Sequence, residues 1–233
     1  MALIKLPQIT ILIADDVNPV LARDVLNICQ RGIEFGAVKL LTSQDVEGAI
    51  KIPPLNTLID YSVFMLAKAH EFIETDYVLI VQRDGFILNP DKWDNNWLKL
   101  DYVAPLFMQY DVVGSGGFSL RSLSMMRRIA SEWPTWDGTS DHANRIQSTM
   151  NYYEDGIISF KYNKPKYGFK IASLEQAADW GQGGNRNPKY FRDRPFGFHR
   201  TWQKIDFETG LVDSSDIGAD LCRNYDHYIE EIK

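Results

Sequence analysis

A carboxylate follows an apolar run in the first half of the chain. Residues 77–90 read Tyr-Val-Leu-Ile-Val-Gln-Arg-Asp-Gly-Phe-Ile-Leu-Asn-Pro. The apolar part, rich in β-branched and aromatic residues, is typical of a strand buried on both faces. Asp84 would emerge at its carboxyl end, the edge where open α/β sheets bind ligands. A carboxylate there is well placed to coordinate a divalent metal that carries a phosphorylated ligand, although an Asp-Gly turn is the commoner use of such residues.

Other residues of this half could contact a nucleotide. Asp15 and Asp16 close the apolar run at residues 8–14, and carboxylates at a strand end can hydrogen-bond a ribose or a base edge. Capping of the next helix explains them equally well. Tyr61 precedes the strand that leads to Asp84 and could stack on a base, but an aromatic residue at helical spacing more often belongs to the core.

A second carboxylate pair, Glu154-Asp155, stands where a helix is expected to begin. Aspartate is a favoured helix cap, and the helix dipole keeps such a carboxylate ionised. An ionised, positioned carboxylate can act as general base toward a hydroxyl group. The dipole also weakens it as a base, so burial or substrate would have to strengthen it. The pair therefore fits a capping role and a catalytic role.

Glycines stand between these two carboxylate sites. Gly114, Gly116 and Gly117 precede an expected helix, where they would let the main chain approach a ligand closely and present amide groups to it. A tight strand-to-helix turn explains them as well. Their position after the Asp84 strand predicts that they form the floor of a sugar site.

A cationic loop and a histidine follow between residues 186 and 199. Arg186, Lys189, Arg192 and Arg194 fall in a segment rich in glycine and asparagine, and this clustering is unusual in an acidic chain. Such a loop could close over a diphosphate, or it could be an ordinary solvated loop. His199 follows in the sequence Phe-Gly-Phe-His-Arg and could be a second metal ligand or a phosphate donor.

Alternating strands and helices must position these residues. Strands are expected at residues 8–14, 37–42, 77–83 and 169–172, and helices after the Asn18-Pro19 start signal and over residues 58–72. This order predicts an α/β fold with a mostly parallel central sheet flanked by helices. The 233 residues are expected to form a single domain, with a nucleotide-binding half at about 8–110, a sugar and acceptor half at about 111–205, and a C-terminal extension at 206–233.

The composition of the chain limits the kinds of partner that it can bind. A net charge of −6 argues against a nucleic-acid surface, and it makes the binding of an anionic nucleotide depend on a metal ion or a few clustered cations. Two cysteines cannot build a disulfide framework. No apolar run approaches the roughly 20 residues of a membrane span, and no signal peptide precedes the first strand. We therefore expect a cytoplasmic protein without a membrane span.

Several separated segments together resemble one known class, the GT-A glycosyltransferases, and more closely a bacterial and viral family placed among them. The matching segments are Tyr61-Ser-Val-Phe-Met-Leu, residues 75–90, Val113-Gly-Ser-Gly-Gly-Phe-Ser-Leu-Arg-Ser, Glu154-Asp155 and Phe196-Gly-Phe-His199. The resemblance implies a single Rossmann-like domain, a nucleotide-sugar donor, a glycan or other hydroxyl acceptor, and Mn²⁺ or Mg²⁺ as cofactor.

The resemblance also implies roles for individual residues. Gln82-Arg83-Asp84 stands where this class carries Asp-x-Asp, so Asp84 would bind the metal and His199 would complete the metal shell. Gln82 departs from the pattern, and this departure bears on metal dependence. Glu154-Asp155 matches the acidic pair that supplies the base in inverting members, with Asp155 as the favoured base. The Gly114–Gly117 stretch would line the junction of donor sugar and acceptor.

The sequence therefore predicts a metal-assisted, inverting hexosyl- or pentosyltransferase. Three alternatives stay open. Gln82 favours a binding protein for nucleotide sugars or carbohydrates that has lost catalysis. Retaining transfer also fits, because a carboxylate at a helix start has an ordinary structural use. A sugar-1-phosphate nucleotidyltransferase would share the fold, but a Gly-rich, basic phosphate loop does not follow the first strand.

Overall fold

The computed structural model describes residues 3–107, 110–133, 138–139, 141, 153–184, 187–200, 205–206 and 208–212. The strands are β1 (Ile4–Ala14), β2 (Ile33–Thr42), β3 (Ile50–Lys51), β4 (Tyr77–Ile80), β5 (Tyr102–Val103), β6 (Ser119–Ser122), β7 (Gly181–Gln182), β8 (Gly197–Phe198), β9 (Ile205–Asp206) and β10 (Leu211–Val212). The α-helices are α1 (Pro19–Cys29), α2 (Leu58–Ala67), α3 (Leu123–Ser131), α5 (Glu154–Ile157) and α6 (Leu174–Trp180). A π-helix at Ile158–Tyr162 continues α5, and 3-10 helices lie at Ala69–Phe72, Pro90–Lys92, Asn95–Lys99, Pro165–Tyr167 and Pro188–Tyr190.

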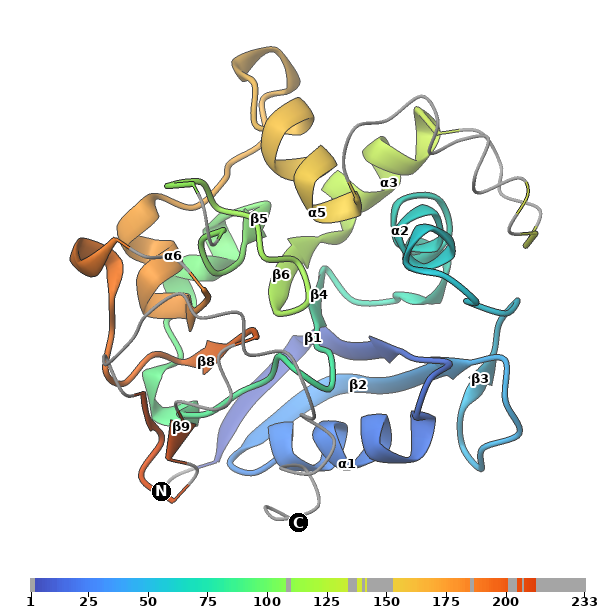
Figure 1. Cartoon of the computed structure of the whole chain (residues 1–233), viewed down its shortest axis with the longest axis horizontal. Coiled ribbons are helices and arrows are strands. Elements are labelled where there is room, and N and C mark those ends of the chain that lie inside the picture. Colours follow the sequence, from blue (N-terminus) through green and yellow to red (C-terminus); the bar gives the residue numbers. More distant parts are fainter. Residues whose placement is uncertain are drawn as a thin grey trace.

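Six strands form the central sheet in the order β3-β2-β1-β4-β6-β5 (Figure 1). The pairs β1–β2, β1–β4 and β2–β3 are parallel, whereas β4–β6 and β5–β6 are antiparallel. Helices cover both faces of the sheet. The predicted α/β class, with a mostly parallel sheet flanked by helices, is confirmed.

The side chains of β1 point alternately to the two faces of the sheet, and both faces are buried. Ile9, Ile11 and Ile13 belong to the hydrophobic cluster that contains the buried side of α1. Leu12 and Ala14 point the other way, into the cluster formed with α2 and α3. A strand sandwiched in this manner needs apolar side chains at successive positions, which is why its sequence is an almost continuous apolar run.

Local capping signals set where the first two helices begin. The side chain of Asn18 accepts a hydrogen bond from the Leu21 amide at 3.2 Å, and Pro19 takes the first helical position. Thr57 and Asp60 form a capping box at the start of α2. The helix expected over residues 58–72 is shorter, because α2 ends at Ala67 and the chain then tightens into a 3-10 turn.

Two expectations for the second half were wrong. No strand forms at residues 169–172, where Ile171 makes a single bridge to Tyr102. The glycine segment at 114–117 leads into strand β6 rather than directly into a helix, so its amides do not lie at a helix start. The strand intervenes because residues 119–122 pair along their whole length with β4.

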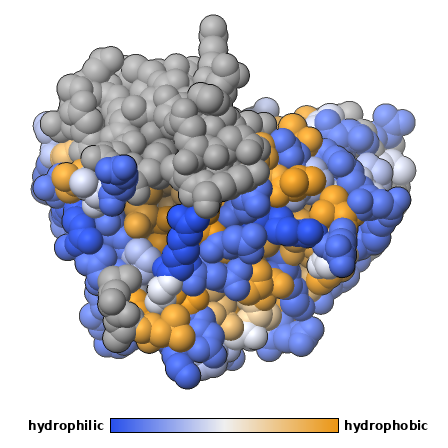
Figure 2. Space-filling view, turned by 90° about the horizontal axis from the view of Figure 1, so that it is seen from below, coloured by the Kyte–Doolittle hydropathy of each residue, from blue (hydrophilic) through white to orange (hydrophobic). Residues whose placement is uncertain are grey.

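Aromatic residues of the second half mostly serve the core. Trp180 is fully buried among Trp97, Phe118 and Phe196, and its indole N–H donates to the carbonyl of Phe118 at 3.0 Å. It is therefore a core residue and not a platform for a sugar. The face seen in Figure 2 is a mosaic in which hydrophobic residues form separate groups among hydrophilic ones. No helix among the described residues has the length and apolarity needed to cross a membrane.

Candidate functional site

A pocket of about 310 Å³ opens at the carboxyl ends of β1 and β4. It is lined by residues 14–17 after β1, residues 55–58 and Tyr61 at the start of α2, residues 82–84 after β4, and Arg200. This is the sheet edge at which the sequence predicts ligand binding. Every residue of the first half that was predicted to contact donor or metal lines this cavity, namely Asp15, Asp16, Tyr61, Gln82, Arg83 and Asp84.

Asp15 holds Arg83 at the pocket wall. One carboxylate oxygen of Asp15 accepts from the Arg83 Nε at 2.7 Å, and the other accepts from the amides of Val17 and Asn18, both at 2.8 Å. Both side chains are largely buried. Asp15 thus ties the end of β1 to the segment after β4 and shapes the turn into α1, whereas the N-cap of that helix is Asn18.

The carboxylate of Asp16 is hydrogen-bonded to other groups of the protein. Its carboxylate accepts from the hydroxyl of Thr42, the amide of Ser43 and the amide of Leu55, each at 2.6 Å. Burial disfavours its charge, but the three hydrogen bonds outweigh burial and lower the pKa of Asp16. The residue joins β1, the end of β2 and the segment before α2. Its side chain therefore shapes the pocket wall.

Asp84 and His199 meet beside the pocket although they are far apart in sequence. The Asp84 Oδ1 lies 3.7 Å from the His199 Nε2, and the Nδ1 of the ring is hydrogen-bonded to the hydroxyl of Ser115 at 2.6 Å. Burial lowers the pKa of His199 to about 4, although the carboxylate of Asp84 acts in the opposite direction. The ring is neutral at physiological pH, which is the form that binds metals.

Tyr61 and Gln82 lie between the pocket and the glycine segment. Tyr61 is buried, and burial together with the charge of Glu154 raises the pKa of its hydroxyl. The Gln82 Oε1 lies 3.3 Å from the His199 Nε2. Tyr61 belongs to the hydrophobic cluster around α2, as helical spacing favoured, and it also lines the pocket.

Gly116 and Gly117 lie between His199 and Asp155, and both of these residues pack closely against the glycines because glycine has no side chain. A Cβ at Gly117 would lie 2.2 Å from the Gln82 Oε1 and 2.3 Å from the His199 Nε2. A Cβ at Gly116 would lie 2.7 Å from the Cβ of Asp155. Real Cβ atoms essentially never come this close to another heavy atom, so a side chain at either position would displace these neighbours. One side of this short segment therefore touches His199, the predicted metal ligand, and the other touches Asp155, the predicted base.

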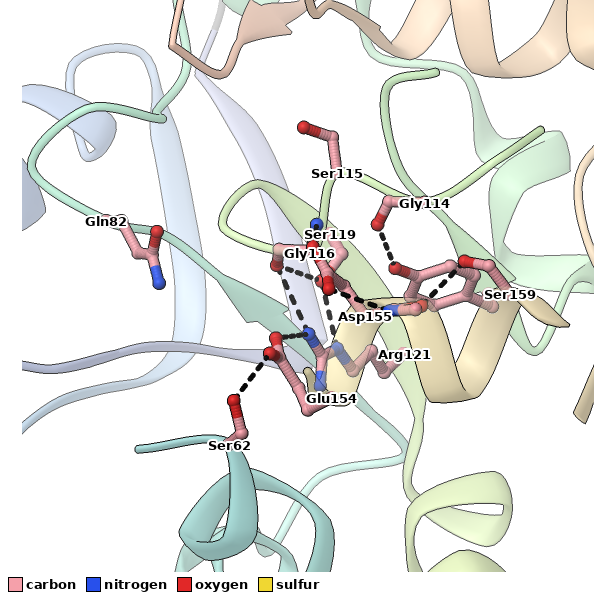
Figure 3. A network of polar contacts seen from close by, with 12 residues as sticks. Ser62, Gln82, Gly114, Ser115, Gly116, Ser119, Arg121, Glu154, Asp155 and Ser159 are labelled. Carbon is pink, nitrogen blue, oxygen red and sulfur yellow. Dashed lines mark hydrogen bonds and ion pairs between the residues drawn. The ribbon is translucent and has the colours of Figure 1, made fainter. Parts of the chain in front are cut away.

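A buried ion pair supports the glycine segment from behind. Arg121 is 1 % exposed, and its Nη2 donates to Glu154 Oε1 and to the carbonyl of Gly116, each at 3.2 Å. Figure 3 shows Arg121 reaching both groups from β6, with Ser62 of α2 approaching Glu154 from the other side. Burial, and after it the charge of Asp155, raise the pKa of Glu154 to about 7 even though Arg121 acts in the opposite sense.

We expect the Glu154→Gln variant to differ from the wild type in its pH dependence of stability. The pKa of Glu154 is raised from 4.5 to about 7, so the native state holds this proton more tightly than the unfolded chain. The stabilisation is fully present below about pH 4.5 and is lost as the pH rises to about 7. Between pH 5 and pH 7 the wild type should lose about 1–2 kcal/mol more free energy of unfolding than the variant, measured by urea denaturation. Parallel pH profiles would contradict the shift.

Asp155 occupies a different place from the predicted cap. Tyr153 is the N-cap of α5, and Asp155 lies within the first turn. Its Oδ1 accepts from the Gly156 amide at 2.7 Å, and its Oδ2 faces the Gly116 amide at 3.4 Å. Asp155 is partly exposed, whereas Glu154 is buried. Of the two predicted carboxylates, Asp155 is thus the one that a substrate can reach.

The cations of the predicted loop that the structure describes, Lys189, Arg192 and Arg194, do not line the pocket. Lys189 pairs with Glu175 at 3.6 Å, and Arg192 pairs with Asp179 at 2.5 Å, both partners being on α6. Arg194 makes two hydrogen bonds to Asp91. Arg186, which was predicted to bind the donor with them, lies outside the described residues. Lys189 and Arg192 form surface ion pairs. The described cations that line the pocket are Arg83 and Arg200.

Sequence reasoning missed four residues of the site. Arg121, Ser62, Ser115 and Arg200 were not singled out, although three of them fall inside segments quoted for the resemblance. An arginine in the middle of the buried strand β6 was the available signal, since a buried charge requires a partner. Ser115 and Arg200 gave no local signal, because their roles arise from contacts with residues distant in sequence.

Residues 49–199 of the chain match the family described as "Protein of unknown function (DUF5672)". The match spans more than half of the chain, so the protein belongs to this family. The matched stretch contains Tyr61, the Gln82–Asp84 segment, both glycines of the floor, the Glu154-Asp155 pair and His199. No curated protein matches the chain. The function is therefore argued from the chemistry of the site.

Proposed function

We propose that the protein is a glycosyltransferase that moves a sugar from a nucleoside-diphosphate donor to a hydroxyl acceptor, with a divalent cation and with inversion at the anomeric carbon. One observation carries the proposal. The segment Gly116-Gly117 packs against Gln82 and His199 on one side and against Asp155 on the other, so the predicted donor residues and the predicted base border the same two glycines. Donor site and base would therefore meet at a single junction.

Asp84 and His199 would hold Mn²⁺ or Mg²⁺. Their ligand atoms are 3.7 Å apart, which suits two ligands of one ion, and a hydrogen bond donated by Nδ1–H to the Ser115 hydroxyl would leave Nε2 free to bind the ion and fix the orientation of the ring. Among the described residues, no group of three or more His, Cys, Asp or Glu side chains is arranged around one point. The site thus fits an ion that takes its other ligands from phosphate oxygens and water. A bound ion would neutralise charge on the departing diphosphate.

The protein's own groups would supply the remaining steps. The pocket beside β1 and α2 would take the nucleoside, with Asp15 and Asp16 holding its walls. Asp155 would accept the proton of the acceptor hydroxyl as its oxygen bonds to the anomeric carbon and the bond to the diphosphate breaks. The buried Arg121–Glu154 pair would hold the carbonyl of Gly116 and so position the floor of the site.

A screen of nucleotide sugars tests the function. Each donor is added to the protein with Mn²⁺ and with EDTA, and the melting temperature is measured. A donor at a hundred times its dissociation constant adds about 2.7 kcal/mol of stability, which is a readable shift. The stabilising donors are then incubated with candidate sugar acceptors, and release of the nucleoside diphosphate is followed. If no donor stabilises the protein and none is consumed, the proposal fails.

A second candidate is a nucleotide-sugar binding protein without catalysis. Gln82 favours it, because an amide replaces the carboxylate that the resemblance leads one to expect beside Asp84. Calorimetry separates the two candidates. Binding of a nucleotide sugar with no product over hours supports the binding protein, whereas steady release of nucleoside diphosphate supports the enzyme.

Alanine substitutions at the two glycines should have different effects. Gly117→Ala places a methyl group against Gln82 and His199, so we expect the dissociation constant for the Mn²⁺-dependent donor to rise at least tenfold. Gly116→Ala displaces Asp155 instead, so turnover should fall while donor affinity changes little. Calorimetry and initial rates measure the two effects. Equal effects of the two substitutions on affinity would count against the proposed division of the site.

A further inference from the structure

Arg200 has an unusual backbone conformation. Among the residues that the structure describes, it is the one non-glycine residue with a positive φ, at 64°. Side chains other than glycine adopt this left-handed region at an energetic cost. Main-chain bonds impose it here, since the Arg200 amide donates to the carbonyl of Asp84 at 2.7 Å and the His199 amide donates to that of Gln182 at 2.9 Å. Strain of this kind, fixed by its surroundings, concentrates at functional sites.

The conformation brings a cation to the pocket. Arg200 is exposed and lines the cavity next to Asp84. The other arginine of the wall, Arg83, is buried and already donates to Asp15. Within the described part of the chain, no carboxylate lies within 4.0 Å of the Arg200 guanidinium. Arg200 is therefore the pocket cation whose charge the described carboxylates leave available.

The charge of the pocket favours such a cation for the binding of an anionic ligand. Three carboxylates line it, those of Asp15, Asp16 and Asp84, against two guanidinium groups. Asp15 is compensated by Arg83, and Asp16 by its three hydrogen bonds. A phosphate approaching Asp84 would still meet negative charge, and a guanidinium facing the cavity offers the planar pair of donors that phosphate oxygens accept.

We propose that Arg200 is the phosphate-binding residue of the pocket and contacts the diphosphate of the ligand. This rests on the proposed function for the identity of the ligand, but its test does not. The left-handed backbone is then the means by which the guanidinium is aimed at the cavity. The cationic loop at residues 186–194, which the sequence favoured for this task, has Lys189, Arg192 and Arg194 engaged by carboxylates.

The test measures binding of inorganic pyrophosphate, which does not depend on the base or sugar of the donor. Calorimetry is done with Mg²⁺ on the wild type, Arg200→Gln, Arg200→Lys and Arg200→Gly, with Arg127→Gln on the exposed side of α3 as a matched control. We expect affinity to fall at least tenfold in the Gln and Gly variants, to fall less in the Lys variant, and to be unchanged in the control. The melting temperature of Arg200→Gly without ligand should not be lowered, because glycine adopts this backbone without strain.

The outcomes separate this proposal from the proposed function. Wild-type affinity in the Arg200→Gln and Arg200→Gly variants overturns the role of Arg200, whatever the protein catalyses. A wild type that does not bind pyrophosphate overturns it as well. Loss of pyrophosphate binding in these variants, with no sugar transfer by the wild type from any donor, supports Arg200 as the phosphate ligand and refutes the transferase. A lowered melting temperature of Arg200→Gly with unchanged binding would show that Arg200 serves the fold alone.

Discussion

The Asp84→Ala variant is expected to transfer sugar at least on the order of a hundredfold more slowly than the wild type. Asp84 stands at the carboxyl end of β4, lines the pocket and lies 3.7 Å from the His199 Nε2. Its removal would leave a neutral imidazole as the only remaining side-chain ligand of the proposed ion. Charge on the departing diphosphate would then lose the compensation that the ion supplies in the transition state, so the loss should appear in turnover and in the affinity for Mn²⁺.

Two controls make this result specific. Asp45→Ala removes an exposed carboxylate, paired with Lys51, that is not part of the pocket, and its transfer rate should equal that of the wild type. Circular dichroism and thermal melting of Asp84→Ala should show a folded protein, because Asp84 is partly exposed and not part of a hydrophobic cluster. Transfer by Asp84→Ala at the wild-type rate, with an unchanged response to Mn²⁺, would falsify the metal role.

The Asp155→Asn variant should also lose on the order of a hundredfold or more in transfer, but by a different route. The amide has the shape of the carboxylate, and its one oxygen can keep the bond from the Gly156 amide at 2.7 Å, so only the longer contact with the Gly116 amide at 3.4 Å is given up. The floor of the site should therefore be preserved. What is lost is the ability to take the proton of the acceptor hydroxyl, so turnover should fall while the dissociation constant of the donor stays within about twofold.

Initial rates and calorimetry on the same preparation measure both quantities. Asp45→Asn provides the matched change from carboxylate to amide at the surface. If Asp155→Asn transfers as fast as the wild type while Glu154→Gln is inactive, the base is Glu154 and the roles of the pair are exchanged. If both variants are fully active, neither carboxylate is the base.

The first half of the fold was predictable because its signals are local. The apolar run of β1, the Asn18-Pro19 start of α1 and the apolar strand before Asp84 each depend on residues that are neighbours in sequence. The edge on which Asp15 and Asp84 meet then follows from the geometry of parallel strands. The end of α2 was less well predicted, since nothing in the apolar pattern distinguishes the last helical turn from the 3-10 turn that follows.

The second half depends on contacts between distant residues, and here prediction was weaker. Arg121 meets Glu154 across 33 positions, and Ser115 meets His199 across 84. Lys189 and Arg192 looked available for a diphosphate because their partners, Glu175 and Asp179, come from a separate helix. Pairing between separate segments is decided by packing, and the sequence of one segment does not reveal it.

The ion pair between Arg121 and Glu154 has a consequence for how this protein can diverge over evolution. Removing one member of a buried pair leaves the other charged and unsatisfied, which costs about 3–5 kcal/mol, whereas an apolar exchange of both members is far better tolerated. Since the two residues also join β6 to α5, related sequences should keep both or change both together. An alignment of relatives in which the two positions vary independently would contradict this expectation.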